Sequence, residues 1–398
     1  MSEIVPEGWK ISQLGNLATV NWGNTTLTKA SYVEEGFPAF SAAGNDGLVT
    51  NAEHHSTGIV LSAIGARCGR TFLTPEKWTA IKNTIAILTD DQDIRYLYHV
   101  FNFDDVWNKS GGAQPFISLG DARKTPILHP PLPEQKKIAS ILTSVDEVIE
   151  TTQKQIDKLQ DLKKATMNEL LTKGIGHTEF KDSELGRIPK TWEVVEISNI
   201  KDKIDQYSFT GGPFGSNLKS EDYTQKGVRI IQLQNIGDGQ FLNNYKIYTS
   251  QEKADELKSC NIFPGDIILS KMGDPVARAT MIPDFETRFL MASDGIRLSI
   301  NKNEYDTKFI LESINHFTFR NQAELKSTGS TRKRIGLVEL RTLKIAIPPL
   351  SEQKKIASIL TSKDITIEKR RCKLTQTQSL KKSLMQDLLT GKVRVQVN

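Results

Sequence analysis

A segment of this chain occurs twice, and that repetition constrains the fold more than any other feature. Residues 130–146 read PPLPEQKKIASILTSVD and residues 348–364 read PPLSEQKKIASILTSKD, so 15 of 17 positions are identical at an offset of 218 residues. The match continues at the same offset, where LKKATMNELLTKG from Leu162 corresponds to LKKSLMQDLLTGK from Leu380. The repeat predicts a tandem duplication, in which one architecture occurs twice along the chain.

Both copies of the repeat are predicted to be long helices. A Pro-Pro pair precedes each copy, a glutamate in the first turn suits the helix dipole, and Gly174 or Gly391 follows the last turn. Apolar residues recur at helical spacing, many of them seven apart, as in a coiled-coil seam. The residues expected in this seam and partner interface are Ile138, Leu142, Val145, Ile149, Ile156, Leu159, Ile356, Leu360, Ile367, Leu374, Leu384 and Leu388.

The length of these helices predicts that they pair with each other. From Glu134 to Lys173 a helix of about 40 residues is roughly 60 Å long at 1.5 Å per residue. A domain half that size cannot bury the apolar stripe of such a helix, so we expect each helix to pack against the other. If the two domains sit at opposite ends of the pair, the helices must run antiparallel. An ordinary core helix is the alternative.

The region ahead of each helix is predicted to be a mixed α/β domain. Short runs rich in β-branched residues, namely GIVLSAIG, NTIAIL, RIIQLQN, DIILSKMG and IRLSI, indicate strands, and Tyr96–Trp107 and Lys308–Leu325 have a helical pattern. The fold class is therefore α/β (α+β), with two such domains joined by two long helices in an antiparallel coiled coil. The predicted segments are a first domain at 1–129, a helix at 130–174, a linker at 175–184, a second domain at 185–347 and a second helix at 348–398.

Composition limits the classes of protein to which the chain can belong. A net charge of +5 and a pI near 8.8 are compatible with nucleic-acid binding without requiring it. The sequence contains no run of about 18 apolar residues, so no membrane span is predicted, and the N-terminal MSEIVPEGWK lacks a secretory pattern. Three isolated cysteines predict neither a disulfide framework nor a zinc site, and a cytoplasmic location fits best.

Catalytic signatures are missing from the sequence. It contains no GxxxxGK[ST] phosphate loop, no HExxH and no GxSxG, and it lacks the Asn/Asp-Pro-Pro-aromatic tetrapeptide of amino-methyltransferases. The adjacent His54 and His55 have no third candidate ligand and are interpreted as part of a surface turn. We therefore expect no catalytic residue, no metal and no cofactor in this chain.

Polar and basic residues near the predicted strand ends are the candidate contacts to nucleic acid, and solvated surface positions are the alternative interpretation. Arginine pairs with guanine and asparagine or glutamine with adenine, whereas lysine and serine more often contact phosphates. Arg70 and Arg278 are favoured because both follow the same LSxxG pattern, and the basic run from Arg332 falls outside the repeat. The candidates are Ser41, Asn45, Ser62, Arg67, Arg70, Lys82, Asn83, Ser216, Arg229, Gln232, Gln234, Asn235, Ser270, Lys271, Arg278, Arg332, Lys333 and Arg334.

The arrangement of these segments resembles the specificity subunits of type I restriction–modification enzymes. Two variable domains each precede PPLxEQKKIASIL and a long helix, and the strings GPFGSNLK (212–219), GVRIIQLQNIG (227–237) and FPGDIILSKMGD (263–274) are similar to motifs of target-recognition domains. The first domain departs from this pattern, with SAAGNDG (41–47) and no GPFGS.

The resemblance implies a role in a larger complex. Each target-recognition domain would bind one half of a bipartite site in double-stranded DNA, and the helices would set the spacer and dock two methyltransferase (modification) subunits. Those partners would bring S-adenosylmethionine, and a restriction/translocase subunit would bring ATP and Mg²⁺. This chain would catalyse nothing.

Three other functions are alternatives to this one. A stand-alone DNA-binding protein would need no methyltransferase partner, and co-purification from the host would distinguish it. An enzyme would show methyl transfer or cleavage with the isolated chain. A coiled-coil scaffold would function without DNA, and any binding would not weaken with added salt.

Overall fold

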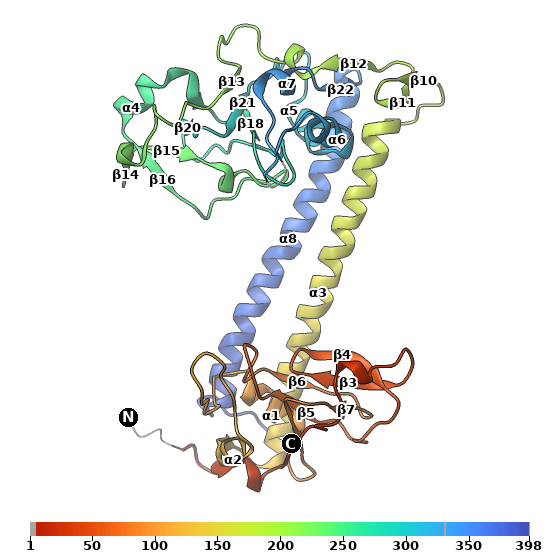
Figure 1. Ribbon diagram of the computed structural model, residues 1–398, viewed down its shortest axis with the longest axis vertical. Helices are drawn as coiled ribbons and strands as arrows, with labels where there is room; N and C mark the ends of the chain where they lie inside the picture. Colours follow the sequence, from red (N-terminus) through yellow and green to blue (C-terminus); the bar gives the residue numbers. More distant parts are fainter. Residues whose placement is uncertain (1–4, 330–331, 398) are drawn as a thin grey trace. The chain divides into compact units, whose positions relative to one another are not determined.

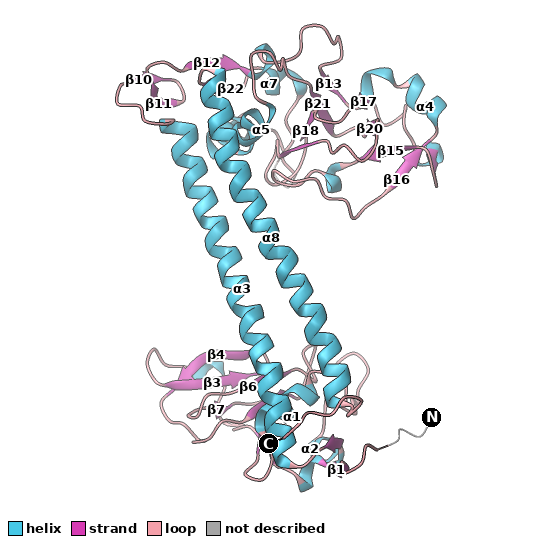
Figure 2. Ribbon diagram, turned by 180° about the vertical axis from the view of Figure 1, so that it is seen from behind, coloured by secondary structure: helices cyan, strands magenta, loops and turns pink. Residues whose placement is uncertain are grey.

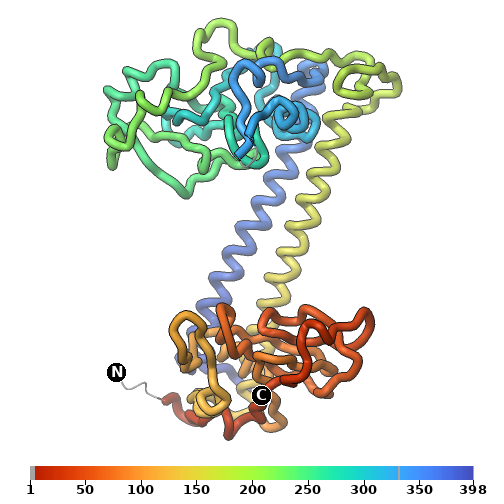
Figure 3. The backbone as a smooth tube through the Cα atoms, in the orientation of Figure 1, coloured from red at the N-terminus to blue at the C-terminus, as the bar shows by residue number. Residues whose placement is uncertain are grey.

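The structure is a computed structural model that describes residues 5–329 and 332–397 (Figures 1 and 3). The chain divides into two compact units, unit 1 with Met1–Ile156 and Arg370–Asn398, and unit 2 with Asp157–Lys369. Each unit therefore combines one α/β domain with parts of two long helices.

The two repeated segments form the long helices α3 (Leu132–Lys173) and α8 (Leu350–Leu389). In unit 1, Ile138 and Leu142 from the start of α3 share a buried core with Met385 and Leu388 from the end of α8. The first turns of one helix therefore contact the last turns of the other, which makes the pair antiparallel (Figure 2).

Unit 2 repeats this packing with the helices exchanged. Ile356 and Leu360 from the start of α8 share a core with Leu171 from the end of α3. The predicted fold class, with two mixed α/β domains and an antiparallel helix pair, is confirmed. The structure leaves none of the twelve predicted seam residues exposed, since each is buried or half-buried.

Glycine ends both helices, as their sequence predicts. Gly174 has a φ of 66° and Gly391 a φ of 70°, both in the left-handed region that side chains with a Cβ rarely adopt.

Apart from the long helices and two 3-10 turns, the described residues of unit 1 form short strands and two short α-helices. Its elements are β1 (Lys10–Gln13), β2 (Thr19–Trp22), β3 (Phe37–Ser41), β4 (Gly44–Val49), β5 (Ile59–Ser62), β6 (Thr71–Leu73), β7 (Thr79–Ala80), β8 (Thr84–Leu88), β9 (Pro126–His129), α1 (Ile94–Phe101) and α2 (Leu119–Lys124).

Unit 2 has more elements because its domain is longer. They are β10 (Phe180–Ser183), β11 (Gly186–Pro189), β12 (Glu193–Glu196), β13 (Phe209–Gly211), β14 (Tyr223–Thr224), β15 (Val228–Ile231), β16 (Ile247–Thr249), β17 (Asn261–Ile262), β18 (Ile267–Ser270), β19 (Ala279–Met281), β20 (Phe289–Met291), β21 (Gly295–Leu298), β22 (Lys344–Ile347), α4 (Gln251–Glu256), α5 (Thr307–Asn315), α6 (Phe317–Leu325) and α7 (Leu337–Arg341).

The sheets extend the duplication into the two domains, where the sequences have diverged. Unit 1 has a four-stranded antiparallel sheet in the order β2-β8-β5-β6, and unit 2 has the matching order β13-β21-β18-β19. A second sheet, β4-β3-β7, corresponds to the central strands β16-β15-β20 of the five-stranded sheet in unit 2. In both copies one strand pair of this second sheet is parallel, β3 with β7 and β15 with β20.

Backbone hydrogen bonds fix the equivalence residue by residue. Ser62 N–H donates to the carbonyl of Arg70 at 2.8 Å, and Ser270 N–H donates to the carbonyl of Arg278 at 2.9 Å. The structural correspondence of Arg70 with Arg278, which the sequence predicted, is thus present in the hydrogen-bonding pattern.

The repeated Glu-Gln pair is explained by the contacts that it makes. Gln135 and Gln353 are both 1% exposed. Gln135 accepts a hydrogen bond at 3.0 Å from the backbone N–H of Asp93, the N-cap of α1, and Gln353 accepts one at 2.9 Å from that of Asp306, the N-cap of α5. Each glutamine also donates to a proline carbonyl ahead of its own helix at 2.9 Å. The repeat is therefore conserved between the two halves where it ties the long helix to its domain.

The glutamate of each Glu-Gln pair binds the segment that follows the end of the other long helix. Glu134 accepts two hydrogen bonds of 2.8 Å from the guanidinium of Arg394. Glu352 accepts hydrogen bonds from Ile175 N–H at 2.9 Å and Trp192 Nε1–H at 3.2 Å, and it contacts His177 Nε2 at 2.9 Å.

Three predicted elements differ from the structure. The run RIIQLQN was expected to be a strand throughout, but β15 ends at Ile231 and Leu233–Asn235 form the 3-10 turn η5. The predicted helix Lys308–Leu325 is two helices, because the side chain of His316 caps α6 by accepting from Thr318 N–H. In addition, α1 ends at Phe101, ahead of the predicted end at Trp107.

Among the described residues, no helix has the length and apolar character needed to cross a membrane. Within the same residues, no group of three or more His, Cys, Asp or Glu side chains is arranged to hold a metal ion.

Candidate nucleic-acid interface

Unit 1 has a cleft at the carboxyl ends of its parallel strands. The residues that follow β3 and β7 line a cavity of about 470 Å³ together with residues from two loops. Such strand ends are where α/β sheets commonly bind ligands, because side chains of adjacent loops converge there. Four predicted contacts, Ser41, Arg67, Lys82 and Asn83, line this cleft.

The acidic side chain of Asp46 organises one wall of the unit 1 cleft. Ser41 Oγ donates to Asp46 at 2.8 Å, Tyr32 Oη donates at 2.6 Å, and Lys29 forms an ion pair with the same carboxylate. Burial alone would raise the pKa of Asp46, but the hydrogen bonds from Lys29, Tyr32 and Ser41 outweigh it and hold that pKa below its usual value. Burial and the bond to Asp46 raise the pKa of the Tyr32 hydroxyl.

Two cations of this cleft are available to a ligand. Arg67 and Lys82 are exposed, and neither has an ion pair or side-chain hydrogen bond within residues 5–329 and 332–397. The cleft therefore offers free positive charge beside the serine and asparagine side chains, which suits a phosphate backbone next to base edges.

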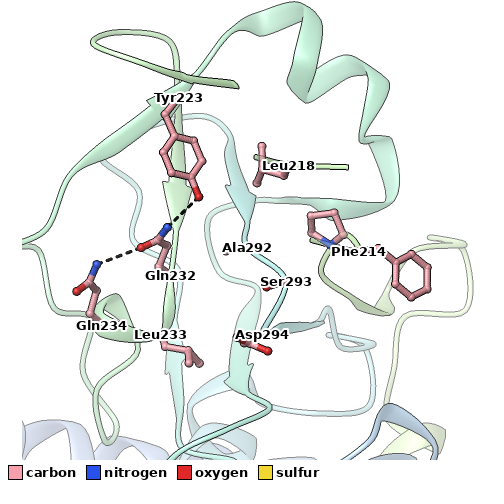
Figure 4. A pocket seen from close by; sticks show the side chains of 10 residues that line it. Phe214, Leu218, Tyr223, Gln232, Leu233, Gln234, Ala292, Ser293 and Asp294 are labelled. Carbon is pink, nitrogen blue, oxygen red and sulfur yellow. Dashed lines mark hydrogen bonds between the residues drawn. The ribbon is translucent and has the colours of Figure 1, made fainter. Parts of the chain in front are cut away.

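Unit 2 has the equivalent cleft, lined by the residues that follow β15 and β20 (Figure 4). Its volume is about 370 Å³. The lining residues are Pro213, Phe214, Leu218, Tyr223, Gln232, Leu233, Gln234, Ala292, Ser293 and Asp294. Gln232 occupies the place of Ser41, because each follows a carbonyl, of Ile231 or Phe40, that accepts from the equivalent backbone N–H at 2.9 Å. Asp294 occupies the place of Asn83, directly before β21 or β8.

A chain of side-chain hydrogen bonds runs along one side of the unit 2 cleft. Gln232 Nε2 donates to Tyr223 Oη at 3.3 Å, and Gln234 Nε2 donates to Gln232 Oε1 at 3.1 Å. Figure 4 shows both bonds and the amide of Gln234 at the outer end of the chain. Gln234 is exposed, whereas Gln232 and Tyr223 are half-buried.

Basic residues border the opposite side of this cleft. Lys271 Nζ donates to the carbonyl of Ser293 at 3.2 Å, and Arg334 forms a 2.5 Å hydrogen bond to Asp294. Burial, and then the positive charge of Arg334, lower the pKa of Lys271. Part of the predicted basic run thus lies beside the cleft, since Arg334 bonds Asp294, which lines it.

Three predicted contacts of unit 2 are instead engaged inside the domain. Arg229 is 3% exposed and donates to the carbonyl of Tyr245 at 3.1 Å, and Asn235, fully buried, donates to that carbonyl at 2.9 Å. Arg278 donates to the carbonyls of Ile236 at 2.7 Å and Leu233 at 3.1 Å. These side chains brace the turn η5, which contains Gln234 and is capped by Gln232, rather than facing solvent.

Ser62 and Ser270 occupy equivalent places and are both fully buried. Neither hydroxyl has a hydrogen-bond partner among the residues that the structure describes. Each lies at the end of an inner strand of its four-stranded sheet, β5 or β18, so contact with DNA would require the strand end to open.

The remaining predicted contacts lie outside the two clefts or at their borders. Asn45 is exposed on β4, Ser216 is exposed on the loop that contains Phe214, and Arg70 and Arg332 are exposed without lining either cleft. Lys333 forms an ion pair with Glu324.

Some residues of the clefts were missed at the level of sequence. Lys29, Tyr223 and Asp294 gave no local signal, because pairing of distant strands brings them to the cleft. Phe214 could have been found, since it lies in the GPFGS string and the structure leaves it 83% exposed.

The equivalent clefts and the antiparallel helices define a protein built from two copies of one α/β domain, and family comparison agrees. The family described as "Type I restriction modification DNA specificity domain" matches residues 6–161 and 189–376. The chain belongs to this family.

Curated relatives extend the match over nearly the whole chain. The type I restriction enzyme MjaVIII specificity subunit of Methanocaldococcus jannaschii is 28% identical over 98% of this chain and 94% of its own length. The putative type I restriction enzyme MjaX specificity subunit of the same organism is 35% identical over 71% of this chain and 64% of its own length.

Solved structures agree in fold. The crystal structure of a type I restriction–modification S subunit from M. genitalium matches with a TM-score of 0.63 at 16% identity, covering 96% of each chain. A chain from a study of complex assembly and conformational transition of the type I R-M system matches with a TM-score of 0.56 at 16% identity, over 98% of this chain and 100% of that one.

Proposed function

We propose that each domain of this chain reads one half of a bipartite site in double-stranded DNA. The observation that carries this proposal is the pair of equivalent clefts, each at the carboxyl ends of a parallel strand pair and each lined by different side chains. One shared framework with two different linings is what recognition of two different half-sites requires. Two weak readers joined in one chain also sum their discrimination, because the second binds at raised effective concentration.

The long helices are proposed to set the spacer between half-sites and to dock two modification subunits. Support for docking comes from Leu162 and Leu380, which occupy equivalent positions of the repeat and are 51% and 53% exposed. Because the same apolar side chain is exposed on both helices, two copies of one partner can bind equivalent surfaces. We assign S-adenosylmethionine to those partners, ATP and Mg²⁺ to a restriction/translocase subunit, and no catalysis to this chain, which we place in the cytoplasm.

A matched insertion in both helices tests the spacer role. Seven residues added to α3 after Ile156 and to α8 after Lys369 keep the heptad seam and lengthen each helix by about 10 Å. At 3.4 Å per base pair this corresponds to at most about three base pairs, since the duplex also turns as it advances.

The readout is selection of bound duplexes from a random library, using the full chain with its modification subunits. The unaltered chain should enrich two half-sites at one spacing, and the variant should enrich the same half-sites at a longer spacing. An insertion in α3 alone is the control, and it should weaken binding because it puts the seam out of register. An unchanged spacer in the doubly extended chain would refute the ruler, and enrichment of no sequence by the unaltered chain would refute DNA reading.

A further inference from the structure

The turn η5 presents one side chain whose hydrogen-bonding groups are fixed before any ligand arrives. Gln234 stands at the outer end of the Tyr223–Gln232–Gln234 chain of hydrogen bonds and is exposed at the cleft (Figure 4). Tyr223 comes from β14, whereas Gln232 caps η5 and Gln234 lies within it, so the bonds join separate segments of the chain.

The support beneath this turn makes it rigid. Asn235 donates to the carbonyls of Leu242 and Tyr245, both at 2.9 Å, and its own side-chain oxygen accepts from Gln232 N–H at 3.0 Å. Arg278 closes the other side through the carbonyls of Leu233 and Ile236. A side chain that is held in place before binding loses less conformational freedom when it binds, and it discriminates better for that reason.

The hydrogen-bonding groups of Gln234 that remain free match those of one base. Whichever way the two amides are turned, the bond to Gln232 uses one group of the Gln234 amide and leaves at least one N–H and one oxygen lone pair free. Adenine presents an acceptor at N7 and a donor at N6 in the major groove, so a single glutamine amide can bond both. Guanine presents two acceptors there and cannot satisfy the amide oxygen.

We infer that Gln234 reads an adenine in the half-site bound by unit 2, and that Tyr223 and Gln232 position its amide. This inference rests on the proposed function and adds the identity of one recognised base. Gln234 is then a specificity-determining residue, and Tyr223 is a positioning residue that acts through Gln232.

Selection from a random duplex library by the full chain with its modification subunits tests the inference. Gln234→Ala should reduce the preference for A·T at one base pair of one half-site by about 5- to 150-fold, the range expected for losing a bidentate pair. Gln234→Glu should move the preference at that base pair toward cytosine, because a carboxylate accepts from cytosine N4. Tyr223→Phe should weaken the same preference while binding to unrelated DNA stays unchanged.

Gln225→Ala is the matched control, since Gln225 is an exposed glutamine ahead of β15, at the other end of the strand. It should leave every position unchanged. The other half-site is an internal check that each variant is folded.

Several results would overturn the inference while leaving the proposed function intact. The first is that the unaltered chain selects half-sites with no adenine whose preference depends on Gln234. The second is that Gln234→Ala leaves every base preference unchanged. The others are that this variant loses base preference over a whole half-site, or loses both half-sites. Failure of the unaltered chain to enrich any half-site would instead refute the proposed function.

Discussion

Arg278 holds the turn η5 through two backbone carbonyls, and replacing it with alanine removes both contacts. Each hydrogen bond from a charged donor contributes about 1.5–3 kcal/mol, and the half-buried position of Arg278 places its bonds at the lower end. Arg278→Ala should therefore lower the stability of unit 2 by about 3 kcal/mol. For a unit of roughly 200 residues this is a fall in Tm of about 6–12 °C.

The equivalent residue Arg70 provides a matched control. Its side chain is exposed and bonded to no residue that the structure describes, so Arg70→Ala should change stability by less than about 0.5 kcal/mol. Arg278→Lys, which has one donor group on a flexible stem, should fall between Arg278→Ala and the unaltered chain.

Calorimetry of the full chain measures the Tm, and hydrogen exchange locates the effect. The N–H of Leu242, which donates to the carbonyl of Asn235 at 2.9 Å, should lose protection in Arg278→Ala and keep it in Arg70→Ala. Recognition of the half-site bound by unit 2 should weaken in parallel. Equal Tm values for Arg278→Ala and the unaltered chain, or equal losses for the two alanine variants, would show that Arg278 does not brace the turn.

Two further predictions concern the scaffold. Burial lowers the pKa of His99 and of His316 to about 4, so each histidine is neutral in the folded chain but takes up its proton near pH 6.5 when unfolded. The free energy of unfolding should therefore fall by up to about 3 kcal/mol per histidine as the pH drops from 6.5 to 4. A urea-unfolding series at constant salt that is flat over this range would contradict that burial. Gln353→Ala should destabilise unit 2 by about 1–3 kcal/mol because it leaves the N–H of Asp306 without its acceptor, whereas Lys354→Ala, at an exposed neighbour, should be neutral in the same thermal unfolding measurement.

Local pattern determined the helices and the duplication. The seven-residue recurrence that begins at Ile138 is a property of consecutive residues, and a helix is built from contacts three and four residues apart. Helix ends followed for the same reason, since a glycine after the last turn, such as Gly174, relieves the left-handed backbone at that point. A repeat with 15 of 17 identical positions is visible in the sequence without a structure.

Tertiary structure alone decided which polar residues face a ligand. Arg70 and Arg278 occupy equivalent positions in the two domains. Arg278 nevertheless bonds carbonyls more than 40 residues away, while the side chain of Arg70 has no such partner in the described chain. Pairing of β15 with β20 brings Asp294 opposite Gln232, and β14 adds Tyr223 to complete the hydrogen-bonded chain. These contacts join segments far apart in sequence, and no local pattern records them, because a side chain's composition gives its bonding capacity but not the partner that folding places beside it.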